Sequence, residues 1–202
     1  ASGRILLAFA DGNDNHHFRS MTTYSDDGGR TWTESNHQVQ LPKRGALEPS
    51  VAQLHNGTLL MSIRTQLGGP HFARSKDQGV TWSAARFSGL EGGESGTCLK
   101  RIPNSNRLVL FFNNSKYIPE HHHSGERTPL TVAISDDDGH HWHIVGNLAD
   151  RQDAEYTNLD CLFTSNGSGL LTYMYAQPAW NRQRIDLRAV VFDVDSLRLA
   201  QP

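Results

Sequence analysis

The chain has 202 residues, of which 37% are hydrophobic and 20% are charged, and its formal net charge is −2. These values are typical of a globular domain with a substantial core. The near-neutral charge gives no reason to expect nucleic acid or an anionic membrane surface as the partner. No apolar run approaches the roughly 18 residues of a membrane-spanning helix.

In chain order, the sequence predicts short strands joined by turns. The first two are at 5–10 and 18–24, on either side of a polar loop. Asn56-Gly57 is the signature of a tight hairpin turn. No stretch has a convincing helical apolar period over three turns. Further strands are expected at 48–54, 58–64, 98–102, 108–113, 130–134, 156–163, 170–175 and 185–194.

An eight-residue pattern, Ser-x-Asp-x-Gly-x-Thr-Trp, punctuates these strands. It occurs at 25–32 (SDDGGRTW) and 75–82 (SKDQGVTW), and a third copy at 135–142 (SDDDGHHW) has His141 in place of the threonine. In a tight turn the hydroxyl and carboxylate accept backbone N–H bonds, glycine supplies a positive φ, and tryptophan fills the gap beneath. We therefore interpret the pattern as structural.

The copies start 50 and 60 residues apart (75 − 25 and 135 − 75). A unit of about four short antiparallel strands at such a spacing is typical of a β-propeller blade. Closed propellers typically have four to eight blades, and the abrupt start of the chain favours an incomplete ring. We expect a partial propeller domain over 1–202, with blade-like units at roughly 1–40, 41–90, 91–150 and 151–202.

The octapeptide resembles the Asp-box of sialidases and related propellers. In sialidases a glutamate begins one strand, a turn follows, and the returning strand ends in an arginine before the next Asp-box. Residues 48–64 (EPSVAQLHNGTLLMSIR) have this pattern, which marks Glu48 and Arg64. A second arginine enters a later box in the family, and 127–135 (RTPLTVAIS) is similar, marking Arg127.

The family then has a Tyr-Ser-x-Leu segment, and 155–159 (EYTNL) resembles it, with threonine for serine. This segment marks Tyr156. The residues follow the order glutamate, arginine, box, arginine, box and tyrosine. This order is a more specific sign of the sialidase family than any one of the residues or boxes alone. The chain thus resembles the middle and C-terminal blades of an all-β, six-bladed sialidase propeller, with about four blades present.

The resemblance implies an exo-α-sialidase-like glycoside hydrolase that retains configuration. Arg64 and Arg127 would hold the carboxylate of sialic acid or a related acidic sugar through bidentate hydrogen bonds. Tyr156 would be the nucleophile, because a neutral phenol avoids repulsion from that carboxylate, and Glu48 would take its proton. We expect the Tyr156 hydroxyl within hydrogen-bond reach of Glu48, at the end opposite the Asp-box tryptophans.

The sequence also departs from the family. The start of the chain has no Arg-Ile-Pro segment to supply the third carboxylate-binding arginine. Asp14, in an early loop, is the candidate acid/base. Taken singly, each marked residue also has a structural interpretation. Glu48 is consistent with an exposed strand edge, each arginine with the end of a loop, and Tyr156 with a place in the core. Two alternatives therefore stay open: a non-catalytic Asp-box propeller that binds glycan or protein, and a glycosidase or lyase for a different acidic sugar.

Two further features leave alternatives open. The histidines at 121–123 fit a solvated loop, a rim that contacts substrate, or a metal site, although no acidic or cysteine partner at ligand spacing supports a metal. Cys98 and Cys161 either pair or stay free. We expect no cofactor, and a sialoglycan or other acidic glycan as the partner. For a bacterial protein, the resemblance favours a secreted or periplasmic location.

Overall fold

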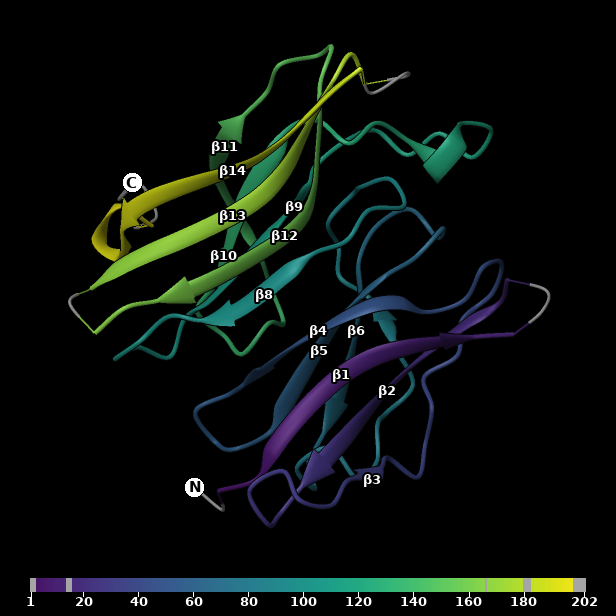
Figure 1. The fold of residues 1–202 in the computed structure, drawn as a ribbon, viewed down its shortest axis with the longest axis vertical. Coiled ribbons are helices and arrows are strands. Elements are labelled where there is room, and N and C mark those ends of the chain that lie inside the picture. The colour runs from purple at the N-terminus through teal and green to yellow at the C-terminus, as the bar shows by residue number, and fades with distance from the viewer. Residues whose placement is uncertain (1–2, 14–15, 166, 180–182, 198–202) are drawn as a thin grey trace.

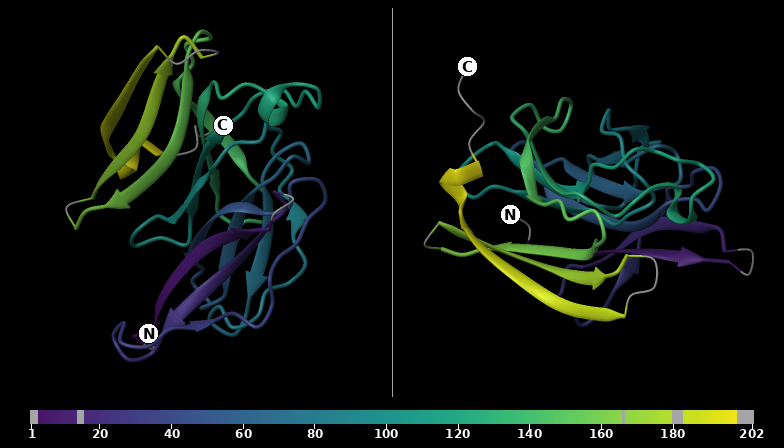
Figure 2. Two further views of the ribbon diagram at one scale, coloured as in Figure 1. Left: turned by 45° about the vertical axis from the view of Figure 1, so that its right-hand side comes forward. Right: turned by 90° about the horizontal axis from the view of Figure 1, so that it is seen from above.

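The computed structural model describes residues 3–13, 16–165, 167–179 and 183–197, and its fold is all-β. Four antiparallel sheets follow one another in chain order, from β1–β3 at the lower right of Figure 1 to β12–β14 at the upper left. Figure 2 shows from two further directions that these two sheets are the ends of the row. Within the described ranges, no helix is long and apolar enough to cross a membrane.

The sheets contain three or four strands each. The first two sheets are built from β1 (Ile5–Gly12), β2 (Phe18–Ser25), β3 (Thr33–Glu34), β4 (Leu47–Gln53), β5 (Leu59–Arg64), β6 (His71–Ser75) and β7 (Arg86–Phe87). The other two are built from β8 (Cys98–Arg101), β9 (Leu108–Asn113), β10 (Leu130–Ser135), β11 (His143–Ala149), β12 (Glu155–Phe163), β13 (Ser168–Gln177) and β14 (Arg184–Asp193). Two short 3₁₀ helices complete the set, η1 (His122–Ser124) and η2 (Val194–Leu197).

These sheets confirm the predicted fold class. The strands expected from alternating or continuous apolar runs are present, with ends shifted by one or two residues. Sequence reasoning missed the strands next to the Asp-boxes, chiefly β6 and β11. The pairing of β11 with β10 has two register shifts, and such bulges disturb the alternation by which a strand is recognised.

The first strand of each sheet lies beside the first strand of the next, because β1 contacts β4, β4 contacts β8, and β8 contacts β12 (Figure 1). Three apolar clusters fill the spaces between successive sheets. The fully buried side chains among them include Met61 and Ile63 in the first cluster, Leu60 and Phe112 in the second, and Phe111 and Ile134 in the third. Burying one such side chain contributes about 1.5–3 kcal/mol to folding.

The three Asp-boxes form the same turn. In each copy the serine Oγ accepts a hydrogen bond from the glycine N–H at 2.8 Å. The aspartate Oδ1 accepts one at 2.9 Å from the N–H at the threonine position. In the third box the His141 Nδ1 lies 2.5 Å from Asp137 Oδ2 and replaces the threonine hydroxyl. The pattern glycines have φ of 90°, 88° and 79°, as the structural interpretation requires.

The box tryptophans join neighbouring sheets. Trp82 is 7% exposed, and its Nε1 donates to Thr22 Oγ1 of the preceding sheet at 3.0 Å. Trp142 is partly buried, with its ring centroid 5.4 Å from that of Phe72, again on the preceding sheet. Trp32, on the first sheet, is 42% exposed. The predicted gap-filling role therefore holds where a preceding sheet packs against the ring.

Candidate functional site

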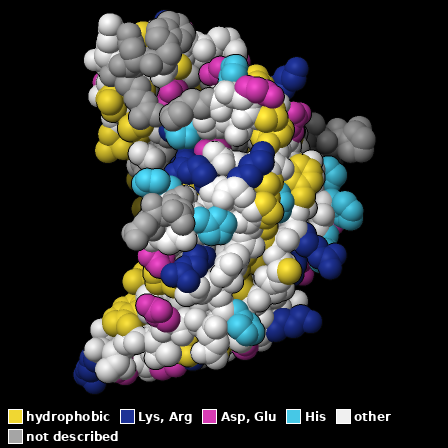
Figure 3. Space-filling model, turned by 90° about the vertical axis from the view of Figure 1, so that its right-hand side faces the viewer, with side chains coloured by type: hydrophobic (Ala, Val, Ile, Leu, Met, Phe, Trp, Pro, Cys, Tyr) yellow, Lys and Arg dark blue, Asp and Glu magenta, His cyan; other side chains and the backbone are white. Residues whose placement is uncertain are grey.

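The strand register places Glu48 and Arg64 at the end of the second sheet opposite its Asp-box. Arg64, at one end of β5, pairs with Leu47, the neighbour of Glu48. Leu59, at the other end of β5, pairs with the Asp-box residue Ser75. This end carries the long loops and η1. Figure 3 views the molecule from that side and shows Lys, Arg and His side chains gathered near its middle.

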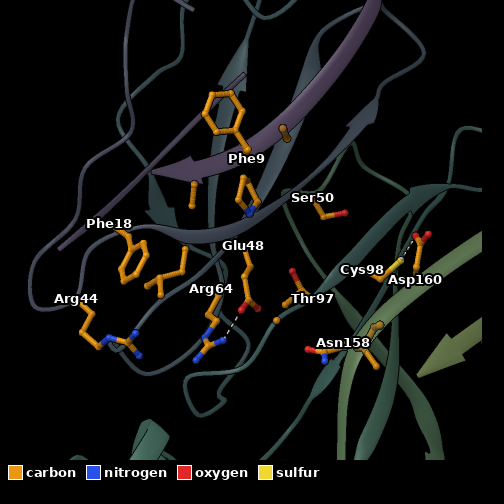
Figure 4. Close-up of a pocket in the computed structure, with 16 residues that line it drawn as sticks. Phe9, Phe18, Arg44, Glu48, Ser50, Arg64, Thr97, Cys98, Asn158 and Asp160 are labelled. Atoms are coloured by element: carbon orange, nitrogen blue, oxygen red, sulfur yellow. Dashed lines mark hydrogen bonds and ion pairs between the residues drawn. The ribbon is translucent and has the colours of Figure 1, made fainter. Parts of the chain in front are cut away.

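A pocket of about 650 Å³ opens where the first strands of all four sheets meet (Figure 4). Its lining includes both charged and apolar side chains. Its walls are residues 8–10 of β1, 47–50 of β4, 96–98 at the start of β8 and 158–160 of β12, together with Phe18, Arg44 and Arg64.

Glu48 projects into this pocket from a strained position. Its φ is +40°, and the pairing of β4 with β5 is interrupted between Leu47 and Ser50. Such bulges re-aim a side chain and are over-represented beside active sites. Glu48 Oε1 lies 2.6 Å from Arg64 Nη1. A Cβ at Gly96 would lie 2.6 Å from Glu48 Oε2, so glycine is needed there to admit the carboxylate.

Asn158 has the same backbone feature on β12. Its φ is +53°, and the register of β12 against β13 shifts between Thr157 and Asp160. It lines the same pocket, near Thr97 (Figure 4). Sequence reasoning did not mark Asn158, although asparagine tolerates the left-handed region better than most residues do. Two different sheets therefore each place one residue of a β-bulge in the pocket.

A buried carboxylate contacts two arginines that line the pocket. Glu94 is 1% exposed, and its Oε1 lies 2.6 Å from Arg44 Nη1 and 3.3 Å from Arg64 Nη2. Its Oε2 accepts a hydrogen bond from Gln66 at 2.9 Å and lies 3.5 Å from His123 Nδ1. Burial alone would raise the pKa of Glu94, but these hydrogen bonds and cations outweigh it and lower the pKa to about 2. Glu94 is therefore an anion.

Sequence reasoning missed Arg44 and Glu94. Both lie in loops, Arg44 before β4 and Glu94 before β8. The only signal was local: Glu94 follows two glycines and precedes Ser95-Gly96, a composition that lets backbone segments approach closely.

Tyr156 follows Glu155 at the start of β12, and its ring lies in the core. The residue is 2% exposed, and its ring centroid lies 5.9 Å from Tyr173 and 5.8 Å from Tyr175. Its hydroxyl accepts a hydrogen bond from the Arg151 N–H at 3.2 Å. Burial raises the pKa of the Tyr156 phenol. At neutral pH the phenol is therefore protonated.

Arg127 lies next to Tyr156, because the Tyr156 N–H donates to the Arg127 carbonyl at 2.9 Å. Its Nη1 is 3.9 Å from Glu155 Oε2. The structure thus brings the Glu48 and Arg64 side chains together, whereas the contact between Arg127 and Tyr156 is made by their backbones.

The expected hydrogen bond between Tyr156 and Glu48 is not formed in the part of the chain that the structure describes. Glu48 is neutralised by Arg64 instead, and the Tyr156 hydroxyl is satisfied by the Arg151 amide. The Glu48 carboxylate and the Tyr156 hydroxyl are therefore each hydrogen-bonded to a different residue. Asp14, the candidate acid/base, lies outside the described residues.

The chain does contain one Arg-Ile-Pro sequence, at 101–103. Its arginine, Arg101, is the last residue of β8. Because Cys98 at the start of β8 lines the pocket, Arg101 lies at the end of the strand that is remote from the pocket. There the Arg101 Nε donates to the Ser105 carbonyl at 3.1 Å. It therefore does not supply a third arginine to the pocket.

Of the candidate metal ligands, His123 lies against Arg64 and Glu94, and His121 Nδ1 is 3.6 Å from Glu126. No group of three or more His, Cys, Asp or Glu side chains among the described residues could hold a metal ion. Cys98 and Cys161 are free and buried. Burial raises the pKa of the Cys98 thiol to about 12 and that of Cys161 to about 11, so neither thiol is activated for nucleophilic attack.

Comparison with known proteins shows what the fold of the chain is similar to. Among solved structures, a mutant of the NanB sialidase of Streptococcus pneumoniae matches with a TM-score of 0.77 at 19% identity, over 98% of this chain and 30% of that one. The intramolecular trans-sialidase of Ruminococcus gnavus matches with a TM-score of 0.68 at 19% identity, over 99% and 42%. A protein of unknown function from Dyadobacter fermentans matches with 0.68 at 23%, over 95% and 50%.

At these identities the likeness is one of fold: four antiparallel sheets that resemble part of a sialidase propeller. The chain spans between 30% and 50% of the length of these solved structures. The family described as BNR repeat-like domain matches residues 1–169. Because this match covers most of the chain, including all three Asp-boxes, the chain belongs to the BNR repeat-like domain family.

Proposed function

We propose that this chain carries part of the active site of a retaining, exo-α-sialidase-like glycoside hydrolase, which cleaves a terminal sialic acid or a related acidic sugar. In this proposal its four sheets are consecutive blades of a larger propeller. The observation that supports the activity best is the ion pair between Glu48 and Arg64, which lies in the pocket at 2.6 Å. It joins a carboxylate able to take a proton and a guanidinium able to hold a carboxylate.

In the proposed reaction the Tyr156 oxygen bonds to the anomeric carbon and its proton passes to Glu48, while the glycosidic C–O bond breaks. Asp14 is our candidate for the acid that protonates the leaving oxygen. Water then attacks the anomeric carbon and gives a proton to Asp14, while the bond to the Tyr156 oxygen breaks and Glu48 returns its proton to that oxygen. Arg64 and Arg127 bind the sugar carboxylate.

This reaction requires the Glu48 carboxylate and the Tyr156 hydroxyl to approach each other. Glu48 must move from Arg64 toward Tyr156, whereas the Tyr156 hydroxyl accepts from the Arg151 amide and keeps its own O–H to donate. A substrate carboxylate that binds Arg64 would favour the movement of Glu48, because it replaces the anion that Arg64 loses. The raised pKa of Tyr156 makes a general base necessary at neutral pH.

The test is turnover of a fluorogenic α-sialoside by the intact protein. Tyr156→Phe removes the attacking oxygen and keeps the ring, so we expect turnover to be abolished while the fold stays intact by circular dichroism. Tyr173→Phe is the matched control, because that ring packs against Tyr156 and has no role in the proposed chemistry. Unchanged activity of Tyr156→Phe would exclude the mechanism.

One observation favours a second function, glycan binding without hydrolysis. Tyr156 is 2% exposed, and a residue so buried does not reach a substrate unless β12 or its neighbours move. The two functions differ in one result. A binding module retains the α-sialoside on the wild-type protein without releasing the fluorophore, whereas the hydrolase releases it.

A further inference from the structure

Two guanidinium groups meet at one buried carboxylate oxygen in the pocket wall. Arg44 Nη1 lies 2.6 Å from Glu94 Oε1, and Arg64 Nη2 lies 3.3 Å from the same atom. Like charges this close repel one another unless an anion lies between them. Glu94 therefore allows two cations to lie side by side, and Figure 4 shows both guanidinium groups on the same side of the pocket.

Arg44 is held in place rather than free to swing into solvent. Its guanidinium carbon lies 5.5 Å from the centroid of the Phe18 ring, and Phe18 also lines the pocket. Glu94 is itself fixed through Oε2, which accepts from Gln66 at 2.9 Å. A side chain anchored in this way loses little conformational entropy when a ligand binds.

The two arginines retain donors for a ligand. A guanidinium has five N–H donors, and Arg44 uses only Nη1 toward other described residues, through Glu94. Its side chain is 36% exposed, so the remaining donors are accessible. Arg64 Nε is buried and has no hydrogen-bond partner among the described residues. A buried donor in that state is costly unless an acceptor reaches it.

We propose that Arg44 is a third carboxylate-binding residue, in addition to Arg64 and Arg127, and that it acts together with Arg64 in this pocket. The group that it binds is the carboxylate of an acidic sugar, because paired planar guanidinium groups match the geometry of two carboxylate oxygens. The identity of the sugar rests on the proposed function. Glu94 is the positioning residue that keeps the two cations together.

The experiment measures binding of N-acetylneuraminic acid and of its methyl ester to the intact protein by titration calorimetry. For Arg44→Gln we expect the Kd of the acid to rise about 10- to 100-fold, the value of a lost charge-assisted hydrogen bond. The Kd of the ester, which has no anionic group, stays as in the wild type. Arg44→Lys keeps the charge without the fork and gives an intermediate Kd for the acid.

The control is Arg86→Gln, which removes one arginine from the exposed edge strand of the same sheet and leaves both Kd values unchanged. The proposal is wrong if Arg44→Gln binds the acid as tightly as the wild type, or if it loses affinity equally for acid and ester. When the wild type turns over the α-sialoside and Arg44→Gln binds the acid normally, only this inference fails. When the wild type does not bind the acid, the sugar assigned here and the proposed function fail together.

Discussion

The two ends of the sheets differ in how their side chains find partners. At the Asp-box end, one hydrogen-bond network recurs three times, and its partners lie two to four residues apart in the chain. At the pocket end the contacts between described residues differ from sheet to sheet. Glu48 and Arg64 are 16 residues apart, Arg44 and Glu94 are 50 apart, and Arg64 and His123 are 59 apart.

This difference separates a structural repeat from a site. A turn that closes on itself depends only on a short sequence, so the same eight-residue pattern forms it in three of the four sheets. A pocket needs different groups at different positions, so each sheet contributes its own residues at the equivalent end. The chemistry that we propose lies at the end opposite the Asp-boxes, where the residues differ from sheet to sheet.

The largest effect is expected from removing a box tryptophan that joins two sheets. Trp82→Ala should lower the free energy of unfolding by about 3–5 kcal/mol, because it leaves a cavity between the first two sheets. Trp32→Ala should cost clearly less, since that ring is 42% exposed. Denaturant titration of both variants checks this ranking, and equal losses would contradict the role assigned to the preceding sheet.

A smaller effect is expected from one methyl group at the pocket end. Gly96→Ala places a Cβ 2.6 Å from Glu48 Oε2, the end of a flexible side chain, so the carboxylate shifts at little cost to the fold. We expect turnover of the α-sialoside to fall about tenfold, which corresponds to about 1.4 kcal/mol, with the thermal midpoint almost unchanged.

Gly57→Ala should have the opposite effects to Gly96→Ala on stability and on turnover. Gly57 has a φ of +85° in the hairpin turn remote from the pocket, and nothing lies within 4 Å of the added Cβ. This variant should lose stability through backbone strain and keep its turnover. A loss of turnover in Gly57→Ala, or of stability alone in Gly96→Ala, would show that the two ends are not separable.

The smallest effect is the response of the Asp-box end to acid. Burial raises the pKa of Asp77, but its hydrogen bonds with Thr81 and Ser75 outweigh this and lower the pKa from 3.8 to about 2. A depressed folded-state pKa means that the unfolded chain binds more protons in this range. The stabilisation is therefore complete above about pH 4 and is lost as pH falls toward 2.

Asp77→Asn should flatten the dependence of stability on pH in that window, as measured by denaturant titration at successive pH values. High salt should reduce the difference between the variant and the wild type, because Asp77 is exposed. An identical slope in Asp77→Asn would mean that the box carboxylate does not govern acid sensitivity.

Most of the strands, the Asp-box turns and the pairing of Glu48 with Arg64 follow from local stretches of the sequence. The last follows from a hairpin centred on Asn56-Gly57, because antiparallel pairing brings together residues equally far from the turn. These features depend on short-range geometry and on the period-2 apolar pattern, both of which can be read from one stretch of chain.

The other contacts of the site depend on how the sheets pack against one another. Arg44 and Glu94 meet because loops from two sheets converge, and Asn158 enters the pocket because β12 lies beside β8. Tyr156 is turned into the core by Tyr173 and Tyr175, on a strand that follows it in the chain. Such contacts are set by how whole sheets pack, since close packing is satisfied across the interface and leaves no periodic trace in any one segment.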